Sequence, residues 1–359
     1  MSDSSSSEIR QRPNHPPASS SSLLDTLLLD EPESESESPS VRILHTLEDF
    51  QSRIHYDPDD KPPGEEPLVK PKDPNALLLR FEELPPWRQD NEFIRSGYRR
   101  TQNSFLGCAK SVFGYIHNET VNIHTHFWGA IAFLLFLTTF YHKIIVDTPT
   151  ATWGDITVIA IFLAAAVTCL SFSAFYHTCE VHSRPVASTC NGFDYAGIVV
   201  LIVGSVVPCV YYGFYCDKIF QKIYLFIFAV SGSLAAYIVL NPEYRKPTHR
   251  GARTKVFVAL GLCGALPVTH GLLTHGFQKL CVEMGFGWML TSAVLYLNGA
   301  VLYANRIPER LYPGSFDLLF SSHQIFHVHV LLAVFAHYRC VLTAFAHWHG
   351  LDEALVCPI

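Results

Sequence analysis

Two histidines four residues apart begin the last long apolar run of the sequence, and a third histidine ends the second such run. The pair is His323 and His327, and the third is His177, which follows Ser173 by four residues. Residues four apart lie on one face of a helix, so the rings of His323 and His327 should project from the same side. Three imidazoles with one open position form the zinc site typical of enzymes, whereas four protein ligands close a structural zinc site.

A carboxylate and a hydroxyl group accompany the three histidines. Asp194 lies in the stretch Phe193-Asp-Tyr-Ala-Gly197 at the start of the third apolar run, where it would orient the attacking water or accept its proton. Ser173 has the same spacing to His177 as the histidine pair and would hydrogen-bond that water or a substrate carbonyl. An equally weighted interpretation is that the Ser173 hydroxyl bonds only to its own helix backbone.

The elements that must position these side chains are membrane-spanning helices. Of the 359 residues, 49% are hydrophobic and only 16% are charged, which is too apolar for an ordinary soluble enzyme. The apolar residues cluster in runs of about 20, the length that crosses a bilayer as a helix. They predict an all-α, seven-helix transmembrane bundle. The predicted spans are 122–143, 154–176, 194–214, 220–240, 255–275, 285–304 and 323–346.

Span counting brings the polar motifs to one depth, because the second span ends at the membrane face where the third and seventh begin. Ionisable groups are costly inside a bilayer, so each is a functional candidate. A single histidine at a helix end is usually an interfacial residue, and a His-x3-His pair arises by chance in a chain with 18 histidines. Three histidines and one aspartate at one depth favour a metal site instead. His124 and His126 alternate along the first span and are not expected to be ligands.

The rest of the chain divides into two tails and a juxtamembrane segment. Residues 1–75 are rich in serine, proline and glutamate and are predicted to be a disordered acidic tail without a secretory signal. Residues 76–121 mix aromatic and basic side chains, which predicts a juxtamembrane segment with a short interfacial helix. The transmembrane domain then covers 122–347, and residues 348–359 form a short C-terminal tail.

Loop charges predict the orientation in the membrane. Lysines and arginines are concentrated on the side shared with the N-terminus, in the juxtamembrane segment and in the loops after the second, fourth and sixth spans. The positive-inside rule places that side in the cytoplasm and the C-terminus outside the cell or in a lumen, in the plasma membrane or an endomembrane. On the opposite side, Cys216 and Cys281 lie near predicted helix ends and are a candidate disulfide pair. No basic patch interleaved with aromatics points to a nucleic-acid partner.

Several stretches become recognisable in combination. They are Leu84-Pro-Pro-Trp87, Ile116-His-Asn-Glu-Thr-Val-Asn-Ile-His-Thr-His126, Ser173-x3-His177, Phe193-Asp-Tyr-Ala-Gly197, Gly204-Ser-Val-Val-Pro208, Pro308-Glu-Arg-Leu-Tyr-Pro-Gly-Ser-Phe-Asp317 and Ser322-His-Gln-Ile-Phe-His327. Together they closely resemble the progestin and adipoQ receptor family, which includes the adiponectin receptors and is related to the bacterial haemolysin III proteins. The resemblance covers about residues 84–347, and Asn118-Glu-Thr-Val-Asn122 is most similar to the fungal Izh-type members.

The resemblance implies a seven-helix fold with a cytoplasmic N-terminus. It also implies that Zn²⁺ is bound by His177, His323 and His327, while Asp194 holds the reacting water. It further implies hydrolysis of lipid amides, with ceramide as the favoured substrate and a fatty acid as a product. A receptor role, for an extracellular protein or a sterol, is implied as well. Fungal relatives are associated with zinc homeostasis and lipid metabolism.

Three hypotheses for the function result. The favoured one is a zinc-dependent, ceramidase-like hydrolase, in which Asp194 is the base and Ser173 stabilises the oxyanion together with zinc. The second is a signalling receptor whose zinc is purely structural, and it is compatible with the first. The third is a zinc sensor or transporter, which ranks last because the outer halves of the spans contain few ionisable groups for a polar path.

Overall fold

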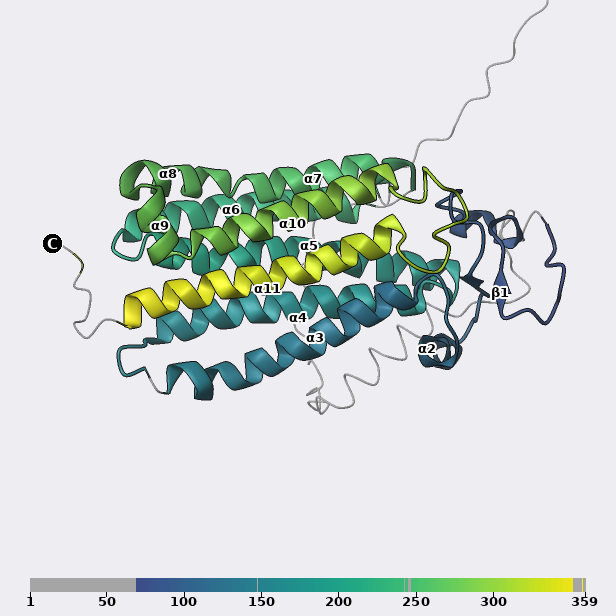
Figure 1. Ribbon diagram of the computed structural model, residues 1–359, viewed down its shortest axis with the longest axis horizontal. Helices are drawn as coiled ribbons and strands as arrows, with labels where there is room; N and C mark the ends of the chain where they lie inside the picture. Colours follow the sequence, from purple (N-terminus) through teal and green to yellow (C-terminus); the bar gives the residue numbers. More distant parts are fainter. Residues whose placement is uncertain (1–68, 147, 242, 245–246, 351–356, 358–359) are drawn as a thin grey trace, which may run out of the picture. The chain divides into compact units, whose positions relative to one another are not determined.

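Seven helices of the computed structural model are long and apolar enough to cross a membrane (Figure 1). The structure describes residues 69–146, 148–241, 243–244, 247–350 and 357, so most of the predicted acidic tail lies outside the described part. The spans are α3 (Thr120–Phe140), α4 (Trp153–Cys179), α5 (Arg184–Gly213), α6 (Lys218–Leu240), α7 with α8 (Arg250–Leu262 and Ala265–His275), α10 (Phe286–Asn305) and α11 (Ser322–His349). The predicted seven-helix membrane bundle is confirmed.

Helix α4 has two long neighbours, since it packs along both α3 and α5, while α11 packs along α10 and also contacts α3, α4 and α5. The main buried cluster joins these helices through side chains such as Phe133, Phe162, Leu170 and Val334. Helices α4 and α5 approach closely because glycine lies at their contact. A β-carbon at Gly197 would lie 3.0 Å from the Cα atom of Cys169. Small residues of this kind let helix backbones approach in membranes.

Helix α5 begins at Arg184, ten residues earlier than the predicted span. The residues before 194 are too polar to be recognised as part of a span, but Ser183 is followed by a proline in the first turn, Pro185, which is a favoured helix start. Asp194 therefore lies in the third turn of α5 and not at its start. The helical position of Asp194 therefore determines the direction of its side chain, which lines the cavity.

Two prolines lie inside membrane-spanning segments, where proline usually kinks or breaks a helix. Pro208 lies inside α5 without ending it. The fifth span is interrupted, because α7 ends at Leu262 and α8 begins at Ala265. The interruption falls just before Pro267, which lacks the N–H group that would bond the carbonyl of Cys263 four residues earlier.

The juxtamembrane segment contains a small sheet, turns and one helix. Strand β1 (Leu78–Leu79) pairs antiparallel with β2 (Tyr98–Arg99). The segment also contains η1 (Phe81–Glu83), η2 (Pro86–Arg88) and α2 (Phe105–Gly114). Elsewhere in the chain, the short elements are η3 (Tyr141–Ile145), η4 (Pro247–His249) and α9 (Phe277–Glu283). The short helix expected in this segment is thus α2, on which Leu106 and Phe113 are exposed. Its interfacial position stays a prediction.

A disulfide joins Cys216, between α5 and α6, to Cys357 near the C-terminus. The candidate pairing of Cys216 with Cys281 is therefore wrong, and Cys281 is a free thiol. The sequence could not distinguish the two partners, because several cysteines occur toward the same membrane side and the path of the C-terminal segment is not a local property of the chain.

Candidate metal centre

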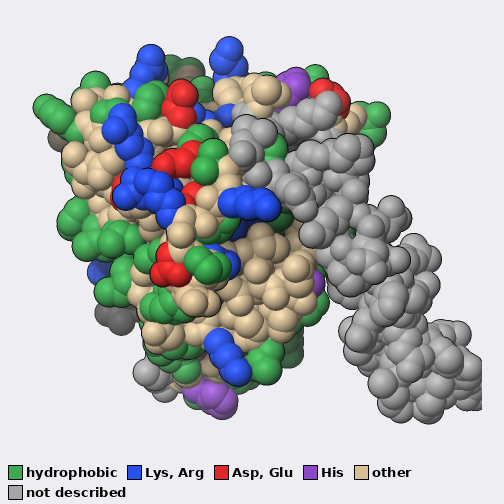
Figure 2. Space-filling view, turned by 90° about the vertical axis from the view of Figure 1, so that its right-hand side faces the viewer, with side chains coloured by type: hydrophobic (Ala, Val, Ile, Leu, Met, Phe, Trp, Pro, Cys, Tyr) green, Lys and Arg blue, Asp and Glu red, His purple; other side chains and the backbone are tan. Residues whose placement is uncertain are grey.

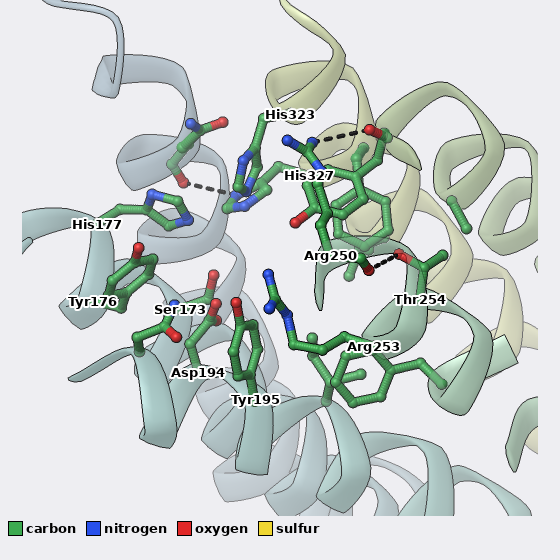
Figure 3. A pocket seen from close by; sticks show the side chains of 18 of the residues that line it. Ser173, Tyr176, His177, Asp194, Tyr195, Arg250, Arg253, Thr254, His323 and His327 are labelled. Atoms are coloured by element: carbon green, nitrogen blue, oxygen red, sulfur yellow. Dashed lines mark hydrogen bonds between the residues drawn. The ribbon is translucent and has the colours of Figure 1, made fainter. Parts of the chain in front are cut away.

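Three imidazoles meet where the last turn of α4 faces the first turns of α11. The ring centroids of His177, His323 and His327 lie 4.7–4.9 Å apart in all three pairs. One nitrogen from each ring lies within 4.8 Å of the others, an arrangement that could hold a metal ion. Figure 3 shows the three side chains turned toward one another. The structure thus brings together the three histidines that their spacing had singled out.

The donor atoms of this cluster suit a metal ion. His177 and His327 are each only 2% exposed, and Nε2 of His177 is buried without a hydrogen-bond partner. A buried imidazole nitrogen with no partner is costly unless something in the native protein binds it. Three imidazole nitrogens are a ligand set that zinc accepts, with room for one further ligand. The residues present therefore fit the zinc ion that the sequence motifs imply.

A buried arginine holds the end of α4 that carries His177. The guanidinium of Arg99 is fully buried and donates to the backbone carbonyl of His177 at 2.5 Å and to that of Thr178 at 3.2 Å. It also donates to Ser111 and pairs with Glu180 at 3.4 Å. The last carbonyls of a helix lack partners within the helix, and a cation there also interacts favourably with the helix dipole. Strand β2 thereby fixes the end of α4.

A buried glutamate, Glu309, holds the start of α11 in place. The Glu309 carboxylate is fully buried and accepts hydrogen bonds from the backbone N–H of Ser322 at 2.7 Å and from its hydroxyl. Asn91 of the juxtamembrane segment donates to the same carboxylate at 3.1 Å. An anion at a helix N-terminus satisfies unpaired N–H groups. Ser322 immediately precedes His323, so this cap holds the first histidine of the pair in place.

Asp194 and Ser173 lie on the two helices that meet at Gly197. Both side chains are buried. They line the same cavity as the three histidines (Figure 3). Asp194 is not one of the residues whose ligand atoms cluster within 4.8 Å. It is thus placed beside the cluster, at the cavity wall.

The cavity beyond the histidines is elongated and mostly apolar. Its volume is about 840 Å³, within the range of small-molecule sites. His327 and His337 both line it, and ten residues of helix separate them, or about 15 Å along the α11 axis. Its apolar wall includes Ile198, Leu201, Met289, Tyr296, Phe326 and Val330. The cavity therefore extends from the histidine cluster into the apolar part of the bundle.

Two buried arginines complete the cavity wall, and neither was identified from the sequence as more than a loop charge. Arg250 and Arg253 lie in the first turn of α7. Arg250 stacks on Tyr303 at 3.7 Å and pairs with Asp90 at 3.4 Å, while Arg253 lies 4.9 Å from the ring of Tyr195. Their spacing of three residues, which places both on one helix face, is the signal that could have identified them.

The sequence also did not identify the residues at the start of α3 as part of the site. Glu119, Asn122 and His126 are three and then four residues apart, so they share a helix face that is directed at the cluster. The ring of His126 stacks on that of His327 at 3.8 Å, although neither His126 nor His124 belongs to the metal-binding group. Burial raises the pKa of the Glu119 carboxyl, but the hydrogen bond from His177 and the attraction of nearby histidines outweigh it and hold the pKa well below its ordinary value.

Seven apolar helices and a cavity with a buried histidine cluster define a membrane protein with a histidine group that could hold a metal ion. Residues 114–338 match the family model described as Haemolysin-III related. The chain is 40% identical over 283 residues to "Progestin and adipoQ receptor-like protein 1" of Caenorhabditis elegans and 38% over 276 residues to "Adiponectin receptor protein" of Drosophila melanogaster. It is 38% identical over 287 residues to "ADIPOR-like receptor IZH2" of Saccharomyces cerevisiae (strain ATCC 204508 / S288c).

These matches cover 79%, 77% and 79% of this chain, respectively. They span 63% of the nematode protein, 59% of the fly protein and 88% of the yeast protein. The chain belongs to the haemolysin III-related family of seven-helix membrane proteins, together with the progestin and adipoQ receptors. The resemblance predicted from the motifs is confirmed.

Proposed function

We propose that this protein is a zinc-dependent hydrolase of lipid amides. The observation that carries the proposal is the convergence of three imidazoles, one with an unpartnered buried nitrogen, at one end of an elongated apolar cavity. The apolar wall that continues from the cluster into the bundle fits the acyl chain of a lipid. A lipid would place its chain along α10 and α11 and its polar group beside the histidines.

The chain's own residues have distinct parts in the proposed reaction. His177, His323 and His327 would hold Zn²⁺, which when bound would lower the pKa of a water molecule and polarise the substrate carbonyl. The Asp194 carboxylate, on the cavity wall beside the cluster, would accept the proton of the attacking water. The Ser173 hydroxyl would donate a hydrogen bond to the carbonyl oxygen as negative charge develops on it.

A ceramide-type amide is the proposed substrate, in line with the resemblance to the adiponectin receptors. Water adds to the amide carbonyl and the C–N bond breaks, which yields a fatty acid and a free amine. The proton taken by Asp194 would be returned to the departing nitrogen, so that the carboxylate is restored after each turnover.

The test is a measurement of zinc content and of fatty acid release on one purified sample of the full chain. We expect about one zinc ion per chain and time-dependent release of fatty acid from ceramide in detergent or bilayers. Release should stop when zinc is removed with a chelator and return when zinc is added. A sample with full zinc that does not cleave ceramide or related lipid amides would contradict the proposed activity.

A receptor role is the second candidate, because the fly relative is named "Adiponectin receptor protein" and the yeast relative "ADIPOR-like receptor IZH2". In that case the metal would hold α4 and α11 together, and the cavity would bind a ligand without changing it. The two roles are compatible, and substitution of Asp194, considered in the Discussion, separates a catalytic metal from a structural one.

We further propose that the N-terminus is cytoplasmic. Figure 2 views the end of the bundle that includes the juxtamembrane segment, and Lys and Arg side chains are spread over it. With epitope tags at both ends, the N-terminal tag should be protected in intact cells and become accessible to antibodies after selective permeabilisation of the plasma membrane. An N-terminal tag that is accessible on intact cells, or that stays protected after this permeabilisation while the C-terminal tag becomes accessible, would reverse the orientation and place the histidine cluster near the outer membrane face.

A further inference from the structure

Helix α3 provides no member of the three-histidine group, yet the turn at its start contacts two of the three histidines. We propose that this turn orients the metal ligands, with Glu119 as the positioning residue for His177 and the backbone carbonyl of Asn122 as the positioning group for His327. The inference rests on the metal site of the proposed function but not on hydrolysis. It identifies a residue on which the affinity for metal depends.

Glu119 bonds the side of the His177 ring that faces away from the cluster. Nδ1 of His177 lies 2.8 Å from Oε2 of Glu119, and Nε2 is the buried nitrogen without a partner. Asn122 donates to the same carboxylate oxygen at 2.6 Å, which holds Glu119 in place. A carboxylate only accepts hydrogen bonds, so Nδ1 carries the proton, and in the neutral ring the lone pair then lies on Nε2. This is the tautomer that a metal ion in the cluster requires.

His327 is held in the same way by a different type of acceptor. Its Nδ1 lies 3.1 Å from the backbone carbonyl oxygen of Asn122. A carbonyl oxygen cannot donate, so this bond also places the proton on Nδ1 and leaves Nε2 available. Two ligands on different helices are thus set to the same tautomer by one turn of a third helix. Partners of this kind orient metal-binding histidines and raise their basicity.

The turn itself is anchored from two sides. The backbone N–H of Asn118 donates to the carbonyl of Gly97 at 2.9 Å, which ties it to the juxtamembrane segment. The side chain of Gln324 donates to the carbonyl of Asn118 at 2.8 Å. Gln324 lies between His323 and His327 in the sequence. Helix α11 therefore anchors the same turn whose Asn122 carbonyl bonds His327. A rigid support of this kind keeps ligands close to their binding geometry.

An alternative is that Glu119 itself binds a metal ion. Glu119, His177 and Glu180 also have ligand atoms within 4.8 Å of one another. In this second group, however, Glu180 pairs with Arg99, and the short hydrogen bond between Glu119 and His177 occupies the two atoms that would face the ion. The two arrangements predict different effects of substitution. Loss of Glu119 should weaken metal binding if it positions His177, and loss of His323 should have no effect if the second group is the site.

The experiment compares zinc affinities of the wild-type protein, Glu119→Ala, Glu119→Gln and His323→Ala by competition with a zinc-binding dye. Glu119→Ala should weaken binding about 10- to 100-fold, the usual range for loss of an outer hydrogen-bond partner. Glu119→Gln keeps an oxygen that accepts the Nδ1 proton, so its loss should be smaller. Glu82→Gln is the matched control, since it makes the same substitution at an exposed glutamate of the juxtamembrane segment that does not line the cavity, and it should bind zinc like the wild-type protein.

Thermal unfolding in the presence of a chelator separates positioning from folding. If Glu119 positions His177, the glutamine variant should unfold in chelator at the wild-type temperature but gain less from added zinc. Unchanged zinc affinity of both Glu119 variants would overturn the inference. So would full zinc binding by His323→Ala with none by Glu119→Ala, because the second group would then be the site. A wild-type protein that binds zinc without cleaving ceramide would contradict only the proposed hydrolysis.

Discussion

Purified His323→Ala and His327→Ala variants should each contain well below one zinc ion per chain, and the triple variant that also carries His177→Ala should contain essentially none. The three imidazoles are the only members of the first metal-binding group among the described residues. Removal of one leaves two ligands, and two imidazoles hold zinc far more weakly than three. The measurement is metal content by mass spectrometry after purification without added zinc.

A matched control is available on the same helix. His329 lies two residues beyond His327, and its ring bonds to the carbonyl of Ile325 and to Asn298 instead of facing the cluster. His329→Ala should therefore keep the wild-type zinc content. A triple histidine variant that folds and retains full zinc would show that the ion, if present, is bound elsewhere, and the proposed metal centre would be abandoned.

Asp194→Asn should keep zinc near the wild-type level while hydrolysis of ceramide falls by about 10²-fold or more, the usual scale for loss of a general base. Asparagine has the size of aspartate and still forms hydrogen bonds, but it cannot accept the proton of the attacking water. The expectation that zinc is retained follows from the structure, in which Asp194 lies on the cavity wall and outside the metal-binding group.

Each outcome of this experiment has a defined meaning. Unchanged turnover with full zinc would exclude Asp194 as the base. Full zinc without turnover in both the variant and the wild-type protein would favour a receptor with a structural metal. Loss of zinc together with activity would place the Asp194 carboxylate on the metal. Asp217→Asn is the control, because Asp217 is an exposed aspartate that caps the start of α6 and does not line the cavity.

The histidine cluster depends on residues far from it in the chain. Arg99 holds the end of α4 and Glu309 holds the start of α11, and both are fully buried charged groups. Two side chains of the juxtamembrane segment bond them, because Asn91 donates to Glu309 and Ser111 accepts from Arg99. The juxtamembrane segment is therefore part of the structure that supports the metal centre, and a truncation that removes it would be expected to lower metal affinity as well as stability.

Much of the architecture was determined by the sequence alone. Apolar runs of about 20 residues predicted seven spans, because a bilayer has a fixed thickness and a helix a fixed rise per residue. The spacing of His323 and His327 predicted a shared helix face, and span counting predicted that His177 and Asp194 reach the same depth. These conclusions needed only local periodicity and the order of the spans.

Only the tertiary structure decided which helices are neighbours. Depth does not specify lateral position, so the sequence could not show that α3 faces both α4 and α11, that Glu119 bonds His177, or that Arg250 lines the cavity. The early start of α5 was missed because a polar first turn has no hydropathy signal, although a helix tolerates it. The disulfide of Cys216 with Cys357 joins residues 141 positions apart. Such contacts depend on packing between distant segments, which periodicity along the chain does not encode.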